Sequence, residues 1–320
     1  MDMLDLLNWR KTCRATYSLA TECLSRDRLR VLKPFAEDAH ALWELVREHR
    51  ALIGGHVAQG FVLRDSLVHR YALELYVPLS AREAFLIDIE LTLGLGWELL
   101  QSWPASDAER AEFYFTEMHY YRARGGRGIA IFTATTEAAV QPLVTSWSTS
   151  FANYLAAETF GVGYPSLTLR RRALACSREE LATNLQRVYD EQRTRHGFQL
   201  SQDVLSWKAY ANLAQSSTCL RDIYLCGHQA RFFGDACSMV ISYDLLSTSS
   251  RKLAEDHRMP YGVSAVWRQE NQSGRSPTCA CREKDPLLPG HLTSVACVIV
   301  DRRALEKAEL PFGGSFTLTL

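Results

Sequence analysis

Adjacent glycines at positions 54 and 55 mark the stretch of the sequence whose residue types and spacing could do chemistry. Residues 57–63 have the apolar pattern of a helix that would start beside Gly54 and Gly55. Glycine lets a ligand approach the backbone closely, and the first N–H groups of a helix are free to bind phosphate. His56 and Arg70 could add contacts to a bound nucleotide. The same two glycines could equally form a turn before a core helix.

The strand expected after this helix carries one carboxylate. Apolar residues alternate over 72–77, which predicts a strand with Glu74 on its other face. Phosphate chemistry with a divalent metal such as Mg²⁺ needs several carboxylate oxygens converging on the ion. Glu117, on a later predicted strand, and Glu137, beyond the next one, are the other acids considered. Because one carboxylate is a poor platform for two metal ions, Glu74 is a candidate remnant of a catalytic site, and activity would need a substitute such as Glu137 or His69.

A second constellation of possible ligands lies further along the chain, at Cys219, Cys226, His228 and Cys237. Three thiols and one imidazole are an acceptable ligand set for structural zinc. Their separations of seven, two and nine positions lack a close Cys-x-x-Cys pair. Cysteine is also often buried as a small apolar residue, so the sequence leaves zinc binding and simple burial open.

Positive charge is densest at Arg170-Arg171-Arg172, to which the arginines around residues 122–127 could add. With Tyr120, Tyr121 and Tyr164 as stacking partners, these residues could bind phosphate or RNA. They could also form an edge strand with a solvated face. Lys plus Arg and Asp plus Glu both total 36, and this balance favours the edge strand and makes nucleic acid an unexpected partner.

Helices and strands are predicted from apolar periodicity along the whole chain. Residues 1–50 have helical spacing, broken at Lys33-Pro34. After the strand at 72–77, Ser80 and Glu83 form a capping box for a helix that runs toward Leu99. Residues 112–122 and 128–135 read as an antiparallel hairpin. A helix is predicted over 136–158, another over 177–195, and strands near 238–246, 261–269 and 294–300.

This order of elements predicts an α+β fold, in which helices flank a small mixed sheet with the strand at 72–77 in its centre. We divide the chain into a helical segment at 1–36, an α/β core at 37–200 and a C-terminal extension at 201–320. Residues 270–291 are rich in Ser, Pro, Gly and charge, and we expect them to form an exposed loop.

The N-terminal sequence LLNWRKTCRATYSL, at 6–19, resembles the later half of an F-box. The segments GYPSLTLRRR at 163–172 and CGHQARFFGDACSMVI at 226–241 resemble a family of basidiomycete fungal proteins with a nucleotidyltransferase-like core and often an F-box-like front. The resemblance covers roughly residues 1–243 and implies a nucleotidyltransferase-like core here. A front of this kind docks to the linker protein of a cullin ligase, although the usual leading Leu-Pro helix is missing from this chain.

The family's first strand commonly reads Asp-Leu-Asp-Ile-Tyr-Val-Pro, and its active members add a third acid on a neighbouring strand. The matching positions in this chain are Ala72 and Glu74, and Gly55 stands where the family has serine. The resemblance therefore implies a degenerate fold that acts as a non-catalytic binding or adaptor protein, in the manner of a substrate adaptor of a ubiquitin ligase, with no cofactor. The alternative is a residual metal-dependent nucleotidyltransferase or nucleotide-binding protein that uses Mg²⁺ with a nucleoside triphosphate.

The amino-acid composition indicates the cellular compartment of the protein. The first residues carry acids and no apolar core of signal-peptide length before Arg10, and no later segment approaches the roughly 18 apolar residues of a membrane span. The nine cysteines are scattered rather than arranged as a dense framework, which fits reduced thiols. We expect an intracellular protein of the cytoplasm or nucleus, with a protein partner and no membrane contact.

Overall fold

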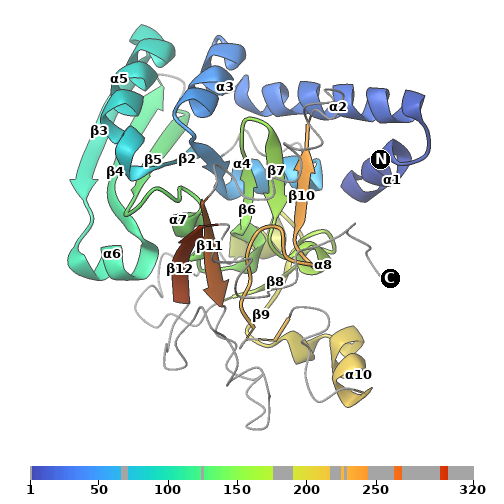
Figure 1. The fold of residues 1–320 in the computed structure, drawn as a ribbon. Coiled ribbons are helices and arrows are strands. Elements are labelled where there is room, and N and C mark those ends of the chain that lie inside the picture. The colour runs from blue at the N-terminus through green and yellow to red at the C-terminus, as the bar shows by residue number, and fades with distance from the viewer. Residues whose placement is uncertain are drawn as a thin grey trace.

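The computed structural model describes residues 2–65, 71–123, 126–175, 190–216, 225–226, 229–243, 263–268 and 296–301. An eight-stranded mixed sheet runs through it in the order β10-β7-β6-β1-β2-β5-β4-β3 (Figure 1). Its strands are β1 Leu52–Gly54, β2 Leu73–Val77, β3 Trp97–Pro104, β4 Phe115–Ala123, β5 Gly128–Ala134, β6 Asn153–Leu155, β7 Thr159–Val162 and β10 Met239–Ser242. Only β2 and β5 pair in parallel among these neighbours. The α+β class and the interior position of the strand at 72–77 are confirmed, but the sheet is larger than expected.

Helices cover the sheet, and capping side chains mark where some of them begin. The main ones are α1 Met3–Arg10, α2 Arg14–Leu32, α3 Ala39–Glu48, α4 Gly55–Leu63, α5 Arg82–Leu93, α6 Asp107–Phe113, α7 Gln141–Val144, α8 Pro165–Thr168 and α10 Lys208–Ser216. The predicted break at Lys33-Pro34 separates α2 from α3, and the Asp38 carboxylate caps α3 by accepting from the N–H groups of His40 and Ala41. No helix in the described residues is long and apolar enough to cross a membrane.

Each face of the sheet has its own apolar core. Side chains alternate along β2, so that Leu73, Leu75 and Val77 face one core and Tyr76 faces the other. The first core is closed by α1 to α5, and the second by α7, α8, α10 and Trp267. Helices α1 and α2 therefore pack into the same core as the central strands, and Arg28 of α2 donates to the carbonyl of Ala157, beyond β6.

The helix expected between Ser80 and Leu99 is shorter than predicted. Ser80 is not its N-cap, because the N–H and hydroxyl groups of Ser80 both donate to the carboxylate of Glu137. Helix α5 begins at Arg82 and ends at Gly94, whose φ of 70° breaks the helix. The residues from Trp97 to Pro104 form β3 instead, a strand that the sequence reading missed.

The helix predicted over 136–158 is also wrong. Only the single turn of α7 and a 3₁₀ turn at Thr149–Phe151 are helical there, and β6 and β7 follow as an antiparallel pair. All residues of β6 and β7 are buried, including the polar Asn153 and Thr159, so neither strand has an exposed face. A short apolar run of that kind has the same hydrophobicity in a helix and in a covered strand, so periodicity could not distinguish them.

The arginine-rich segment does not form the predicted edge strand. Helix α8 ends at Thr168, and Arg171 adopts a left-handed conformation with φ of 53° before β8 Arg172–Leu174. Strand β8 pairs in parallel with β9 Gln199–Ser201. A residue with a positive φ between two short elements turns the chain sharply. The alternation of leucine and arginine in the sequence does not predict this turn.

Other predicted elements are confirmed. The hairpin is β4 and β5, although β4 begins at Phe115 because Ser106 and Glu109 form a capping box that makes the preceding residues helix α6. The late strands are β10, β11 Val263–Arg268 and β12 Ala296–Asp301, and the last two pair as an antiparallel hairpin. Residues 190–194 are the end of the predicted helix at 177–195; its first part and the loop at 270–291 lie outside the described residues.

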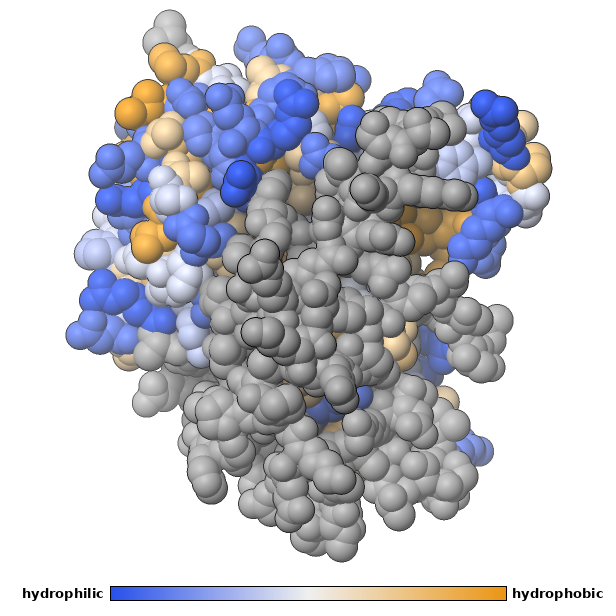
Figure 2. Space-filling view, viewed as in Figure 1, coloured by the Kyte–Doolittle hydropathy of each residue, from blue (hydrophilic) through white to orange (hydrophobic). Residues whose placement is uncertain are grey.

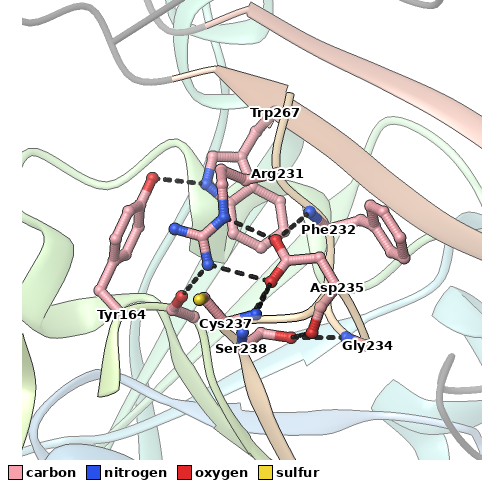
Figure 3. Close-up of polar contacts among 9 residues, drawn as sticks. Tyr164, Arg231, Phe232, Gly234, Asp235, Cys237, Ser238 and Trp267 are labelled. Carbon is pink, nitrogen blue, oxygen red and sulfur yellow. Dashed lines mark hydrogen bonds and ion pairs between the residues drawn. The ribbon is translucent and has the colours of Figure 1, made fainter. Parts of the chain in front are cut away.

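A buried ion pair between Arg231 and Asp235 fastens the segment before β10 to the second core (Figure 3). The Arg231 guanidinium donates to Asp235 over 2.5 Å and to the carbonyl of Gly163 over 2.6 Å, and it lies over the ring of Tyr164 at 4.6 Å. Asp235 also accepts from the backbone N–H groups of Phe232, Cys237 and Ser238. Burial works to lower the pKa of Arg231, but the charge of Asp235 holds it above its usual range.

Replacing Arg231 with methionine is expected to lower the free energy of unfolding by about 3–5 kcal/mol, because it leaves the Asp235 carboxylate buried without its counter-ion. Urea unfolding of the full chain measures this. The matched control is Arg47→Met, which breaks an exposed pair with Glu44 within α3 and should change stability by about 0.5 kcal/mol or less. Equal, small losses in both variants would show that the pair does not fasten this segment.

Candidate functional site

The glycine turn and strand β2 lie against each other in the predicted site. Gly54 ends β1 and lies opposite Glu74 in the antiparallel register of β1 and β2. Gly55 opens α4 with a left-handed φ of 58°. A Cβ atom added at Gly54 would overlap the ring of Tyr76, and one added at Gly55 would overlap the carboxyl group of Glu74. Both glycines are therefore required by packing, and Gly55 also by its backbone conformation.

The Glu74 carboxyl group occupies the space above the first turn of α4. Its Oε2 accepts a hydrogen bond of 2.8 Å from the Tyr76 hydroxyl, two residues along the same face of β2. Burial raises the pKa of Glu74, and the hydrogen bond from Tyr76 offsets only part of this effect. Burial raises the pKa of Tyr76 well above its usual range, so this hydroxyl stays protonated and acts as the donor.

The other candidate carboxylates lie elsewhere. Glu117 on β4 is in register with Thr133 of β5 and, through it, with Val77 of β2, so it faces the first core, on the side of the sheet opposite Glu74. There it forms an ion pair with Arg82, the first residue of α5, and lies 3.2 Å from the His119 imidazole. Burial works to raise the pKa of Glu117, but Arg82 and His119 hold it below the usual range.

Glu137 lies in the loop after β5 and is bound to Ser80, while Ala72 supplies no ligand atom. No group of three or more His, Cys, Asp or Glu side chains within the described parts of the chain could hold a metal ion. The structure therefore does not bring Glu74 together with Glu117 or Glu137. His69, the remaining substitute considered from the sequence, lies outside the described residues.

His56 sits in the first turn of α4 but is turned into an aromatic cluster. Its imidazole stacks on Tyr71 with centroids 3.9 Å apart and an interplanar angle of 4°, and it meets Phe151 edge-on at 4.8 Å. Its Nε2 atom is buried and has no hydrogen-bond partner among the residues that the structure describes. Burial, with a smaller contribution from His196, lowers the pKa of His56 to about 3. The ring is therefore neutral at physiological pH and brings no charge to a phosphate. Arg70 lies outside the described residues.

A polar chain that the sequence reading missed lies on the other side of this cluster. The Tyr71 hydroxyl and Nε2 of His196 are 2.7 Å apart, and Nδ1 of His196 lies 3.6 Å from Asp65. Arg171 donates to the carbonyl of His196 and lies 3.7 Å from Asp65. Burial lowers the pKa of His196 and raises that of Tyr71, which favours a neutral imidazole that accepts from the Tyr71 hydroxyl. The chain joins the helix end at 190–194 to α4 and β2.

Sequence alone offered one signal for this chain of polar groups. His196 and Gly197 directly follow the helix predicted over 177–195, and Gly197 has a left-handed φ of 65°. Tyr71 and His196 are 125 positions apart, so only the folded chain brings them together. A hydroxyl, an imidazole and a carboxylate in series can relay a proton, but the distance from His196 to Asp65 is too long for a direct hydrogen bond.

Arg171 and Arg172 of the arginine cluster make contacts within the molecule. Arg171 makes the contacts described above, and Arg172 lies 5.7 Å from the ring centroids of both Trp207 and Tyr210. Tyr121 and Tyr164, considered as stacking partners for bases, are buried. Tyr121 donates to Glu90 of α5, and Tyr164 accepts from the indole N–H of Trp267. These two tyrosines have no face free for a nucleic acid.

Of the four predicted zinc ligands, the structure describes only Cys226 and Cys237, both half-buried. Cys219 and His228 lie outside the described residues. The backbone N–H of Cys237 donates to Asp235, next to the buried ion pair. Burial raises the pKa of the Cys237 thiol, which disfavours the thiolate that zinc requires.

Comparison with known proteins gives no significant match, whether to a protein-family model, a curated protein or a solved structure. The function of the chain has to be inferred from the geometry of its own side chains.

The contact between Gly55 and Glu74 can be tested by adding one methyl group. Gly55→Ala should destabilise the protein more than Gly197→Ala, since Gly197 has a similar positive φ of 65° but a Cβ added there would meet only the Arg171 side chain, at an ordinary contact distance of 3.8 Å. Both variants incur the backbone cost of about 1–2 kcal/mol, and Gly55→Ala adds an overpacking cost of about 1–3 kcal/mol.

Removing the Glu74 carboxyl group should remove the overpacking cost of Gly55→Ala. The double variant Gly55→Ala with Glu74→Ala is expected to be more stable than the sum of the single changes in urea unfolding predicts. Simple additivity, or equal losses for Gly55→Ala and Gly197→Ala, would show that Glu74 does not occupy the space above the turn.

Proposed function

We propose that this chain is a non-catalytic binding or adaptor protein, built on a degenerate nucleotidyltransferase-like core. The observation that carries the proposal is the position of the Glu74 carboxyl group: it packs against Gly55 and accepts from Tyr76, in the space that a phosphate bound at the start of α4 would need. A phosphate placed there would lie against the Glu74 carboxyl group as well as the N–H groups at the start of α4. A raised pKa also makes Glu74 a weaker ligand for a hard cation.

The distance between the acidic side chains is the second observation that supports a non-catalytic protein. Ligand oxygens must come within about 2.0–2.6 Å of Mg²⁺ or Ca²⁺, so carboxylates that share an ion lie close together. Glu74 and Glu117 point from opposite faces of one sheet, and Glu117 is already neutralised by Arg82. A conventional site with two metal ions would require both side chains to leave their partners and one of them to cross the sheet.

The helical front supplies a surface for a protein partner. Most apolar residues of α1 and α2 are buried against the core, but Trp9 and Leu19 are 37% and 53% exposed. Both lie within the segment that resembles an F-box, which is the reason for naming a cullin-ligase linker protein as the partner. In this role the remainder of the chain would select the substrate.

Isothermal titration of the full chain with Mg²⁺ and each of the four nucleoside triphosphates should give no metal-dependent heat of binding. Glu74→Gln is the matched control, because it keeps the size of the side chain and an oxygen that can accept from Tyr76. Mg²⁺-dependent affinity in the micromolar range that Glu74→Gln and Glu74→Ala both abolish would establish a metal-dependent nucleotide site at Glu74 and overturn the adaptor-only proposal.

The same titration with a purified cullin-ligase linker protein tests the partner. Binding should be lost when Trp9 and Leu19 are both replaced by alanine, and kept when the comparably exposed Leu79 is replaced. Binding that is undetectable in the unchanged protein would remove the ligase part of the proposal and leave the non-catalytic part to the nucleotide titration.

A further inference from the structure

Two histidines, His56 and His196, lie next to each other beneath the surface. Hydrophilic residues dominate the described part of the surface that Figure 2 shows, whereas His196 is only 4% exposed and Nε2 of His56 is buried. The centroids of the two imidazoles are 5.6 Å apart, and the Tyr71 ring contacts both of them. We call His56, Tyr71 and His196 the histidine cluster. Since histidine is the side chain that ordinarily changes charge between about pH 5 and 8, this cluster is a candidate pH sensor.

The histidine cluster joins a late part of the chain to α4. His196 belongs to residues 190–201, which contain the helix end described above and strand β9, and which we call the covering segment. A second contact with α4 lies beside the cluster, where the buried Gln192 and Gln59 side chains exchange hydrogen bonds of 3.2 and 3.3 Å. The covering segment therefore packs against the same helix through one neutral amide pair and through the two imidazoles.

The surroundings of the two imidazoles favour their neutral forms. Nε2 of His196 accepts from the Tyr71 hydroxyl over 2.7 Å, and Nε2 of His56 has no hydrogen-bond partner among the described residues. Burial lowers the pKa of His196, and burial together with the nearby His196 lowers the pKa of His56 to about 3. Protonation of both rings in the closed arrangement would bury two like charges side by side, which is unfavourable in a poorly solvated place.

The charged groups around His196 balance one another. Asp65, which follows α4, lies 3.6 Å from Nδ1 of His196, and Glu191 is the second acid that raises the pKa of this imidazole. Each acid has an arginine beside it, because Arg171 lies 3.7 Å from Asp65 and Arg195 lies 3.4 Å from Glu191. Two acids and two arginines leave no net negative charge to compensate two imidazolium ions.

The acidic side chains on the elements that pack against α4 have their own partners as well. Glu74 of β2 accepts from the Tyr76 hydroxyl, and Asp27 of α2 pairs with Arg64 at the opposite end of α4 from His56. The remaining described elements packed most closely against α4 are β1, β6 and the 3₁₀ turn after α7, and they carry no carboxylate and no basic side chain. Among the described residues, His56 therefore has no acid beside it to stabilise its charged form.

We propose that the histidine cluster is an acid-sensitive switch, which holds the covering segment against α4 while both rings are neutral and releases it when they take up protons. In the released state the rings reach water and regain an ordinary pKa of about 6.5. Because the closed state has the lower pKa values, its stabilisation by the cluster is complete above about pH 6.5 and falls as the pH drops below that value. Release would uncover His56 and the first turn of α4. The proposal does not depend on the function proposed above.

Hydrogen exchange of the full chain, followed by mass spectrometry and corrected for the intrinsic effect of pH, tests the release. Between about pH 7.5 and pH 5, amides of the covering segment should lose protection by about 30-fold on account of His56 alone, since pH 5 is about 1.5 units below the ordinary pKa and each unit favours the open state about tenfold. Amides of β5, in the interior of the sheet, should remain protected at both pH values.

The matched variant for this experiment is His56→Phe with His196→Gln. Phenylalanine keeps an aromatic ring against Tyr71, and the glutamine amide keeps an oxygen that can accept from its hydroxyl. This variant should protect the covering segment equally at both pH values, while the control His40→Gln, at an exposed histidine of α3, should keep the full response to acid. A covering segment that stays protected at pH 5 in the unchanged protein, or that opens equally in the double variant, would overturn the proposal.

Proton uptake on unfolding tests His56 without the His196 substitution. In urea unfolding of His56→Phe alone, the equilibrium constant of unfolding should change about 30-fold less between pH 7.5 and pH 5 than in the unchanged protein, because the folded state no longer excludes one proton. The same dependence on pH in both proteins would show that His56 is not held neutral by the fold and would contradict the switch.

Discussion

The close approach of β2 to the glycine turn is the constraint on which the centre of this molecule depends. Strand β2 lies between β1 and β5, and its Glu74 and Tyr76 side chains fill the space against which α4 begins. A Cβ atom at Gly54 or Gly55 would overlap Tyr76 or the Glu74 carboxyl group, so one of these groups would have to shift. Since α4 contributes Val57 and Phe61 to the first core, the turn positions helix and sheet together. Gly54 and Gly55 thus have a packing role at the start of α4.

Buried polar groups fix the segments that follow the central sheet. The Arg231–Asp235 pair ties the chain before β10 to Gly163 and Tyr164, and the Tyr71–His196 hydrogen bond ties the helix end at 190–194 to the start of β2. Polar groups removed from water are costly unless they are paired, so each of these contacts favours one arrangement of its segments. Within the segment at 226–241, Arg231 and Asp235 neutralise each other's charge.

Local patterns predicted those parts of the fold in which local and tertiary preferences agree. The helices before residue 50, the strand at 72–77, the β4–β5 hairpin and the three late strands have clear periodicity or turn residues. Two failures have a common cause. Strands β6 and β7 are covered on both faces, and β3 is exposed on almost all of its residues, so neither shows the alternation of a half-buried strand.

The candidate site was predicted in part. Gly55 and Glu74 do meet, but the sequence could not show that Glu74 would fill the turn, because the left-handed conformation of Gly55 and the register of β1 and β2 arise only in the fold. Nor could it show that Glu117 faces the opposite core, which depends on the register of three strands. The contact of Tyr71 with His196 joins residues too distant in sequence for any spacing to indicate.

The most direct measurement is an NMR titration of the Glu74 carboxyl carbon in the full chain, with and without Mg²⁺. Burial should give this group a pKa above that of an ordinary glutamate, with no response to Mg²⁺. Because the folded state then holds the proton more tightly than the unfolded state, this group stabilises the fold most below the ordinary pKa, and the contribution falls as pH rises through the folded value. A pKa at or below the ordinary value, with a shift of the Glu74 signal on adding Mg²⁺, would contradict the assignment of Glu74 as a packing residue.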